Sequence, residues 1–177
     1  MNNTNIEKDT MLEKKINKKD FKIGVLGMGY VGLPLACEFS SVGIQTYGFD
    51  INSTVISNLN KGISHIQDIE DSTIKKNIDS QTIYFTDDFS KLKEMDVISI
   101  CVPTPLRKTK DPDMSYILSA VEFVKKSLRK EQLIILESTT YPGTTNELIL
   151  PILEESGLKS GEDFYLAFSP ERVDPGN

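Results

Sequence analysis

Residues 21–32 read FKIGVLGMGYVG, and this stretch decides the fold. Its first seven residues have the composition of a short buried strand, and a helical pattern of apolar residues begins at Tyr30. Between the two, Gly27, Gly29 and Gly32 have the spacing G-x-G-x-x-G. A strand, a glycine-rich turn and a helix in this order are typical of the first βαβ unit of a dinucleotide-binding domain.

The three glycines have different physical roles in such a turn. Gly27 permits the tight turn, Gly29 lets the backbone approach a pyrophosphate, and Gly32 lets the helix lie close to the strand. The N-terminus of the helix adds N–H groups and the positive end of the helix dipole, both of which favour phosphate.

Asp50 ends the next apolar segment, 18 residues after Gly32. A carboxylate at this position can accept hydrogen bonds from both hydroxyls of the adenosine ribose and would repel a 2′-phosphate, so NAD is favoured over NADP. Neither Asn52 nor Ser53 supplies a positive charge for that phosphate. The alternative is structural: an ordinary glycine turn, with Asp50 capping the end of a strand.

The rest of the chain continues the alternation of strands and helices. Further strands are predicted at residues 44–50, 82–86, 96–102, 132–138 and 164–169, and helices at 30–42, 53–59, within 63–81, at 115–128 and at 145–156 with a kink at Pro151. This order predicts an α/β fold, a doubly wound (Rossmann-like), mostly parallel six-stranded sheet with helices on both faces. Residues 21–177 form the domain, and residues 1–20 form a polar, flexible leader with at most a short helix.

Composition excludes several classes of protein. The 177 residues carry a net charge of −6, which disfavours nucleic acid as a partner, and no apolar run is long enough to cross a membrane. The N-terminus has no apolar segment of the kind found in signal peptides. Cys37 and Cys101 are expected to be core residues of a cytoplasmic protein, His65 is expected at the surface, and no metal site is predicted.

Three further strand ends have unusual sequences. They read CVPTP at residues 101–105, ESTTYPG at 137–143 and SPERVDPG at 169–176. Hydroxyl groups and charges here alternate with prolines that stiffen the loops. Ligands of open α/β sheets lie beyond the carboxyl ends of the strands, so these loops indicate a site beside the dinucleotide.

These blocks carry a resemblance to a known family. GMGYVGLPLA, CVPTP, ESTTYPGTT and SPERVDPGN, in this order, resemble the nucleotide-sugar 6-dehydrogenases of the UDP-glucose/GDP-mannose dehydrogenase family. SPER followed by DPGN, where glucose-type and mannose-type members usually have NPEF, is most similar to members acting on UDP-N-acetylglucosamine or related UDP-N-acetylhexosamines. The resemblance implies oxidation of the sugar C6 alcohol to a carboxylate by two NAD, through a cysteine thiohemiacetal and thioester, for bacterial surface polysaccharides.

The resemblance also implies the site residues. Thr104 would line the cofactor, Thr139 would touch NAD and order a water, and Glu171 would work with that water in proton transfer and contact the substrate. Arg172 stands where family members have an aromatic residue, and it is expected either to help hold the substrate or to be an ordinary solvent-facing arginine. The pyrophosphate would be bound by Gly27, Met28, Gly29, Tyr30, Val31 and Gly32, and the ribose by Asp50.

The chain also departs from the family pattern. Val55 stands where a basic residue is common, and Pro175 where glucose-type members have a second glutamate. The cysteine block and dimerisation helix of the family are absent, so we expect a truncated chain whose full-length form is a homodimer. One alternative is a truncated NAD-binding module without activity of its own. Another is a different NAD-dependent enzyme, such as a 3-hydroxyacyl or 6-phosphogluconate dehydrogenase.

Overall fold

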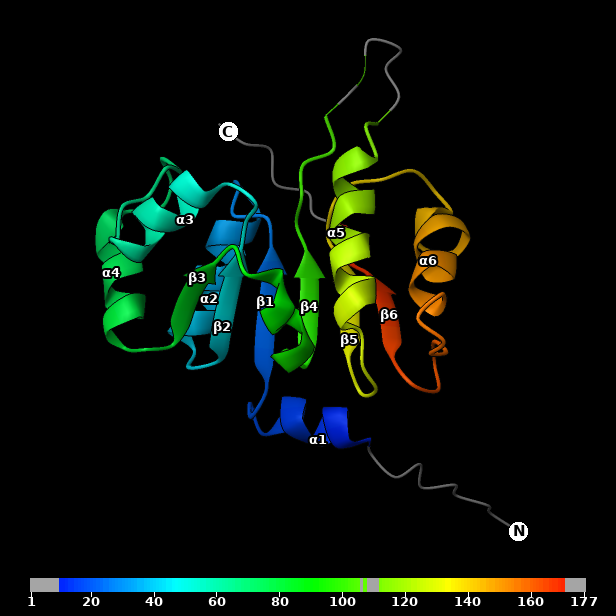
Figure 1. Cartoon of the computed structure of the whole chain (residues 1–177). Coiled ribbons are helices and arrows are strands. Elements are labelled where there is room, and N and C mark those ends of the chain that lie inside the picture. The colour runs from blue at the N-terminus through cyan, green and yellow to red at the C-terminus, as the bar shows by residue number, and fades with distance from the viewer. Residues whose placement is uncertain (1–9, 106, 108–111, 171–177) are drawn as a thin grey trace.

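The computed structural model describes residues 10–105, 107 and 112–170 as one sheet with helices on both faces (Figure 1). The six strands are all parallel and lie in the order β3-β2-β1-β4-β5-β6. The predicted doubly wound fold is therefore confirmed. The strands are β1 (Lys22–Leu26), β2 (Gln45–Phe49), β3 (Ile83–Thr86), β4 (Val97–Ile100), β5 (Leu133–Leu136) and β6 (Tyr165–Phe168).

Two apolar cores lie on opposite faces of the sheet. One packs α2 and α4 over the first three strands, and the other packs α5 and α6 over β4 to β6. Alternate residues of β4 belong to different cores: Val97 to the first, and Ile98 and Ile100 to the second. The helices are α1 (Met11–Asn17), α2 (Gly32–Ser41), α3 (Ser53–Asn60), α4 (Asp71–Asp79), η1 (Phe89–Glu94, 3₁₀), α5 (Ser115–Ser127), η2 (Thr144–Ile149, π) and α6 (Leu150–Glu154).

The register of the strands brings their carboxyl ends to one edge. Leu26 pairs with Phe49 on one side and Ile100 on the other, and the pairing continues through Leu136 to Phe168. The segments that follow these residues are the glycine turn, Asp50 and the loops after β4 to β6. The topology therefore places the glycine turn, Asp50 and the described residues that follow β4, β5 and β6 along a single edge of the sheet.

The described part of the expected flexible leader is instead a packed helix, α1. Thr10 caps it, because its hydroxyl accepts from the Glu13 N–H at 3.1 Å and its own N–H donates to the Glu13 carboxylate. Leu12 is buried against the first core. The short helix that the prediction allowed is thus present at Met11–Asn17 and is packed on the domain, and residues 1–9 lie outside the described part.

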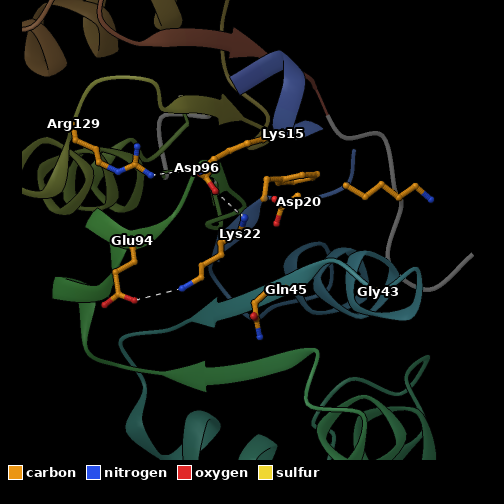
Figure 2. Close-up of a pocket in the computed structure, with 10 residues that line it drawn as sticks. Lys15, Asp20, Lys22, Gly43, Gln45, Glu94, Asp96 and Arg129 are labelled. Carbon is orange, nitrogen blue, oxygen red and sulfur yellow. Dashed lines mark hydrogen bonds and ion pairs between the residues drawn. The ribbon is translucent and has the colours of Figure 1, made fainter. Parts of the chain in front are cut away.

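A buried carboxylate fixes α1 under the amino-terminal edge of the sheet (Figure 2). Asp96 accepts hydrogen bonds from Lys15 Nζ at 2.8 Å and Arg129 Nη2 at 3.0 Å, and from the Lys22 N–H at 3.0 Å. Burial alone would raise its pKa, but these bonds outweigh that effect and hold the pKa of Asp96 below its usual value. The ion pairs join α1, β4 and the loop after α5.

The segment predicted as one kinked helix over 145–156 is two elements. A π-helical turn ends at Ile149, and α6 begins at Leu150 with Pro151 in its first turn. Proline lacks the N–H that an uninterrupted α-helix would need at this position, so the change of helix type next to Pro151 has a direct cause.

Candidate functional site

The glycine turn is closely packed against the end of β4. The Gly27 N–H donates to the Phe49 carbonyl at 2.8 Å, and Gly27 has φ of +94°, which disfavours other residues. A Cβ on Gly27 would lie 2.7 Å from the Cys101 carbonyl oxygen, and one on Gly32 would collide with the carbonyl oxygen of Gly27. The protein itself therefore requires two of the three glycines.

Gly29 is different, because no protein atom lies within 4 Å of the position where a Cβ would be. The protein contacts give no reason for a glycine here. A pyrophosphate drawn close to the backbone would give one, since a side chain would fill the space that the phosphates need. The turn thus fits a dinucleotide by its open space as well as by its spacing.

Asp50 is oriented by two backbone amides. Its Oδ2 accepts from the Met28 N–H and its Oδ1 from the Asn52 N–H, both at 2.8 Å. A carboxylate has about four acceptor positions, so capacity for two ribose hydroxyls remains. Asn52 in turn caps α3, accepting from the Thr54 N–H at 3.0 Å. The first bond joins Asp50 to the glycine turn.

The remaining predicted turn residues occupy distinct environments. The side chain of Met28 is fully buried in the first core, so only its backbone belongs to the site. Tyr30 is 47% exposed, and Val31 is half-buried directly before α2.

These groups open into a cleft of about 600 Å³ at the carboxyl edge of the sheet. The strand order places β2 on one side of β1 and β4 on the other, so α3 and α5 flank the turn (Figure 1). The lining residues are Leu26, Gly27, Met28, Gly29, Phe49, Asp50, Ile51, Asn52, Val55, His65, Phe89, Val102, Pro103, Ser115, Tyr116, Ser119, Ala120 and Phe123.

Sequence reasoning missed the α5 wall of this cleft. Ser115, Ser119 and Phe123 follow one another at a spacing of four and present one helix face to the cleft. Phe123 stacks on Phe89 of η1, with ring centroids 4.1 Å apart and an interplanar angle of 16°. The spacing in the sequence was the available signal, but the contact with the turn depends on the strand order. His65 is exposed, as predicted, and it also lines the cleft.

The loops after β4 and β5 are joined by a residue that the sequence did not single out. The hydroxyl of buried Ser138 donates to the carbonyls of Val102 at 2.7 Å and Ile100 at 3.2 Å. Thr104 is half-buried and Thr139 is exposed. Neither is among the residues that line the cleft.

Two predicted site residues are outside the described part of the chain, and a second hollow lies away from the cleft. Glu171 and Arg172 lie outside the described residues. The second hollow, of about 440 Å³, lies around Asp96 at the opposite edge of the sheet (Figure 2). The Asp96 carboxylate in this hollow already accepts three hydrogen bonds from the protein, so most of its acceptor positions are used by the fold.

Both cysteines are buried, as predicted. Burial raises the pKa of the Cys37 thiol to about 11, so it is protonated at neutral pH. Cys101 lies within 3.4 Å of the Ser99 hydroxyl in the sheet. In the described ranges, no cluster of three or more His, Cys, Asp or Glu side chains could hold a metal ion. None of the described helices has the length and apolar character to cross a bilayer.

The chain is similar in sequence to nucleotide-sugar dehydrogenases along most of its length. The UDP-N-acetyl-D-glucosamine 6-dehydrogenase of Pseudomonas aeruginosa is 41% identical over 160 residues, which are 90% of this chain and 37% of that protein. The UDP-N-acetyl-D-mannosamine dehydrogenase of Pyrococcus horikoshii is 42% identical over 156 residues, 88% of this chain and 37% of that protein. The chain thus spans less than two fifths of the length of these curated relatives.

Solved structures agree with the sequence comparison. That of the Pyrococcus horikoshii UDP-D-ManNAc dehydrogenase superposes with a TM-score of 0.81 at 43% identity, over 88% of this chain and 37% of that one. That of an NDP-N-acetyl-D-galactosaminuronic acid dehydrogenase from Methanosarcina mazei Go1 gives 0.84 at 39% identity, over 96% and 38%. Residues 21–177 match the family described as the UDP-glucose/GDP-mannose dehydrogenase family, NAD binding domain, which gives NAD as the cofactor of the domain. This match over most of the chain, together with the identity to the relatives, shows that the chain belongs to the UDP-glucose/GDP-mannose dehydrogenase family.

Proposed function

We propose that this chain is the cofactor-binding part of an enzyme that oxidises the C6 alcohol of a UDP-N-acetylhexosamine. UDP-N-acetylglucosamine is the first candidate, and the product is the uronic acid, formed with reduction of two NAD for bacterial surface polysaccharides. Support comes from the relatives named for UDP-N-acetyl-D-glucosamine and UDP-N-acetyl-D-mannosamine. The observation that carries the proposal is the placement of Asp50 against the glycine turn.

The charge of Asp50 supports a preference for NAD over NADP. A 2′-phosphate on the adenosine ribose would lie beside this carboxylate, whose two oxygens are already fixed by N–H groups. The cleft has no lysine or arginine among its described lining residues. Two neighbouring negative charges repel each other, and no lysine or arginine that lines the cleft would offset this repulsion.

We assign the substrate side to the loops after β4, β5 and β6. NAD supplies the hydride acceptor when bound. Thr104 contacts the cofactor, the Thr139 hydroxyl holds a water, and Glu171 transfers protons between that water and the substrate, while Arg172 binds the substrate. The parallel register supports this assignment because it brings the first two loops to the edge where Gly27 lies.

A second candidate is a chain that binds NAD without turnover of its own. It is favoured by the burial of both cysteines, since a thioester mechanism needs an accessible thiol near the substrate. We therefore propose that the nucleophile belongs to a further part of the enzyme. We also propose that the full-length enzyme is a homodimer and works in the cytoplasm, where thiols such as these remain reduced.

Calorimetric titration of this chain with NAD and NADP tests the cofactor site. We expect NAD to bind and NADP to bind far more weakly; equal or tighter binding of NADP would overturn the assignment of Asp50. Absorbance of NADH during incubation of a full-length enzyme with UDP-N-acetylglucosamine or UDP-N-acetylmannosamine tests the substrate. The same assay on this chain alone is expected to give no turnover.

A further inference from the structure

Part of the cleft lining is apolar, and the group formed by Ile51, Val55, His65, Tyr116 and Phe123 is called the slot below. On the β2 side it is lined by Ile51 and Val55, and Ile51 is 71% exposed. Tyr116 and Phe123 of α5 line the same cleft, and the Phe123 ring is stacked on Phe89. A flat apolar group of a ligand would bury the exposed Ile51 side chain, which directly follows Asp50.

His65 also lines this slot, although it is separated from Asp50 by the whole of α3. Its loop is fixed on both sides. The Ser64 N–H donates to Asp71 Oδ1 at 2.7 Å, the Ser64 hydroxyl donates to the Ile66 carbonyl at 2.9 Å, and the Ile66 side chain is buried. The imidazole therefore extends from an anchored turn and not from a loose loop.

The chemistry of the slot matches an adenine base. With the ribose on Asp50, the pyrophosphate lies toward Gly29, so the base must lie on the other side of the ribose. Adenine needs flat apolar contacts on its faces and polar groups at its edge. An imidazole can stack on a base and also offers ring nitrogens as hydrogen-bond partners.

We propose that His65 is a further cofactor-binding residue, which contacts the adenine of the dinucleotide. This inference rests on the proposed NAD site and extends it to the loop between α3 and α4. The residue acts on affinity for the adenosine half and has no part in hydride transfer.

Titrations with fragments of the cofactor test the proposal. We expect His65→Ala to weaken binding of NAD and of AMP by the same factor, about 5- to 10-fold for the loss of one ring contact. Binding of nicotinamide mononucleotide is expected to stay unchanged. His65→Phe keeps a ring and is expected to recover most of the lost affinity. The control is Gln67→Ala, an exposed residue of the same loop that does not line the cleft.

The outcomes separate this inference from the proposed function. If the unmutated chain binds no NAD, the proposed function itself fails. If it binds NAD and His65→Ala binds AMP equally well, only the role of His65 is overturned. The role of His65 would also be overturned if His65→Ala had a lower melting temperature while His65→Phe was fully stable and still bound AMP weakly. In that case the ring at this position would make no contact with the adenine.

Discussion

The Asp50 carboxylate accepts a hydrogen bond from the Met28 N–H at 2.8 Å, so this carboxylate and the glycine turn form one unit. Met28 lies between the first two glycines of the turn, and its side chain is fully buried. The buried side chain fixes the amide, and the amide fixes the carboxylate. A change at Asp50 should therefore affect the turn as well as the ribose.

Replacement of Asp50 by Ala is the first prediction. The variant loses the acceptor for the ribose hydroxyls and the partner of the Met28 N–H. We expect NAD binding to weaken about 10- to 100-fold, because a hydrogen bond to a charged group contributes about 1.5–3 kcal/mol. NADP binding should change less, so that the difference between the two cofactors narrows.

The control for this change is Asp79→Ala, which removes an exposed carboxylate at the end of α4. It should leave the Kd of both cofactors unaltered in the same calorimetric titration. If Asp50→Ala weakened NAD and NADP equally, the carboxylate would not distinguish the two cofactors.

Gly29 and Gly32 form a matched pair for the second prediction. Gly29→Ala should fold with a nearly unchanged melting temperature, because its Cβ meets no protein atom within 4 Å, and should lose most NAD affinity. Gly32→Ala should lose about 1–3 kcal/mol of unfolding free energy, as expected for overpacking, because its Cβ collides with the Gly27 carbonyl oxygen. Thermal denaturation with and without NAD separates the two effects. A destabilised Gly29→Ala would contradict the finding that the space beside Gly29 is open.

Most of the fold could be predicted because its signals are local. The six strands lie where short apolar runs are followed by a polar residue, a glycine or a proline, as at Gly27 and Asp50. Helix α1 was not predicted as packed because Leu12 is its one buried side chain, and its attachment depends on Asp96, far away in sequence. Such pairing across the fold has no periodic signature in a sequence.

The candidate site also has one part that local sequence predicts and one part that it does not. The glycine turn and Asp50 could be predicted from the sequence because they belong to one βαβ unit, in which Asp50 follows Gly32 by 18 residues. The wall formed by Ser115 and Phe123 is not readable in this way, because it requires β4 to lie next to β1. Ser138 was likewise missed as a link between loops, since serine at a strand end has several ordinary uses.

The third prediction concerns Asp96 and pH. Asp96→Asn should lower the unfolding free energy at pH 7 by about 1–3 kcal/mol, because two cationic side chains lose their charged partner. The pKa of Asp96 is lowered in the folded protein, so its stabilisation is present above the unfolded value of about 3.9. It is lost as pH falls through the lower folded value.

Urea denaturation at a series of pH values checks this. The difference between the unmutated chain and Asp96→Asn should be constant from pH 7 to pH 5 and should shrink below about pH 4. Glu94→Gln is the comparison variant, because its exposed ion pair with Lys22 at 3.8 Å should contribute less than about 1 kcal/mol. A difference that grew as the pH fell would have the wrong sign for a lowered pKa.

The last prediction separates two adjacent hydroxyls, those of Ser138 and Thr139. Ser138 is buried, and its hydroxyl donates to the Val102 carbonyl at 2.7 Å, so it joins the loops after β4 and β5. Thr139 is exposed at the same strand end. In a full-length enzyme, Thr139→Ala should reduce kcat about 10- to 100-fold, on the order of one lost catalytic hydrogen bond, and leave the melting temperature unchanged. Ser138→Ala should instead lower the melting temperature, with unfolding free energy reduced by about 1 kcal/mol. Thr139→Ser, which keeps a hydroxyl, should restore most of the turnover. Unchanged kcat in Thr139→Ala at saturating NAD and substrate would remove this residue from the catalytic site and leave Ser138 as the strand-end hydroxyl with a defined role.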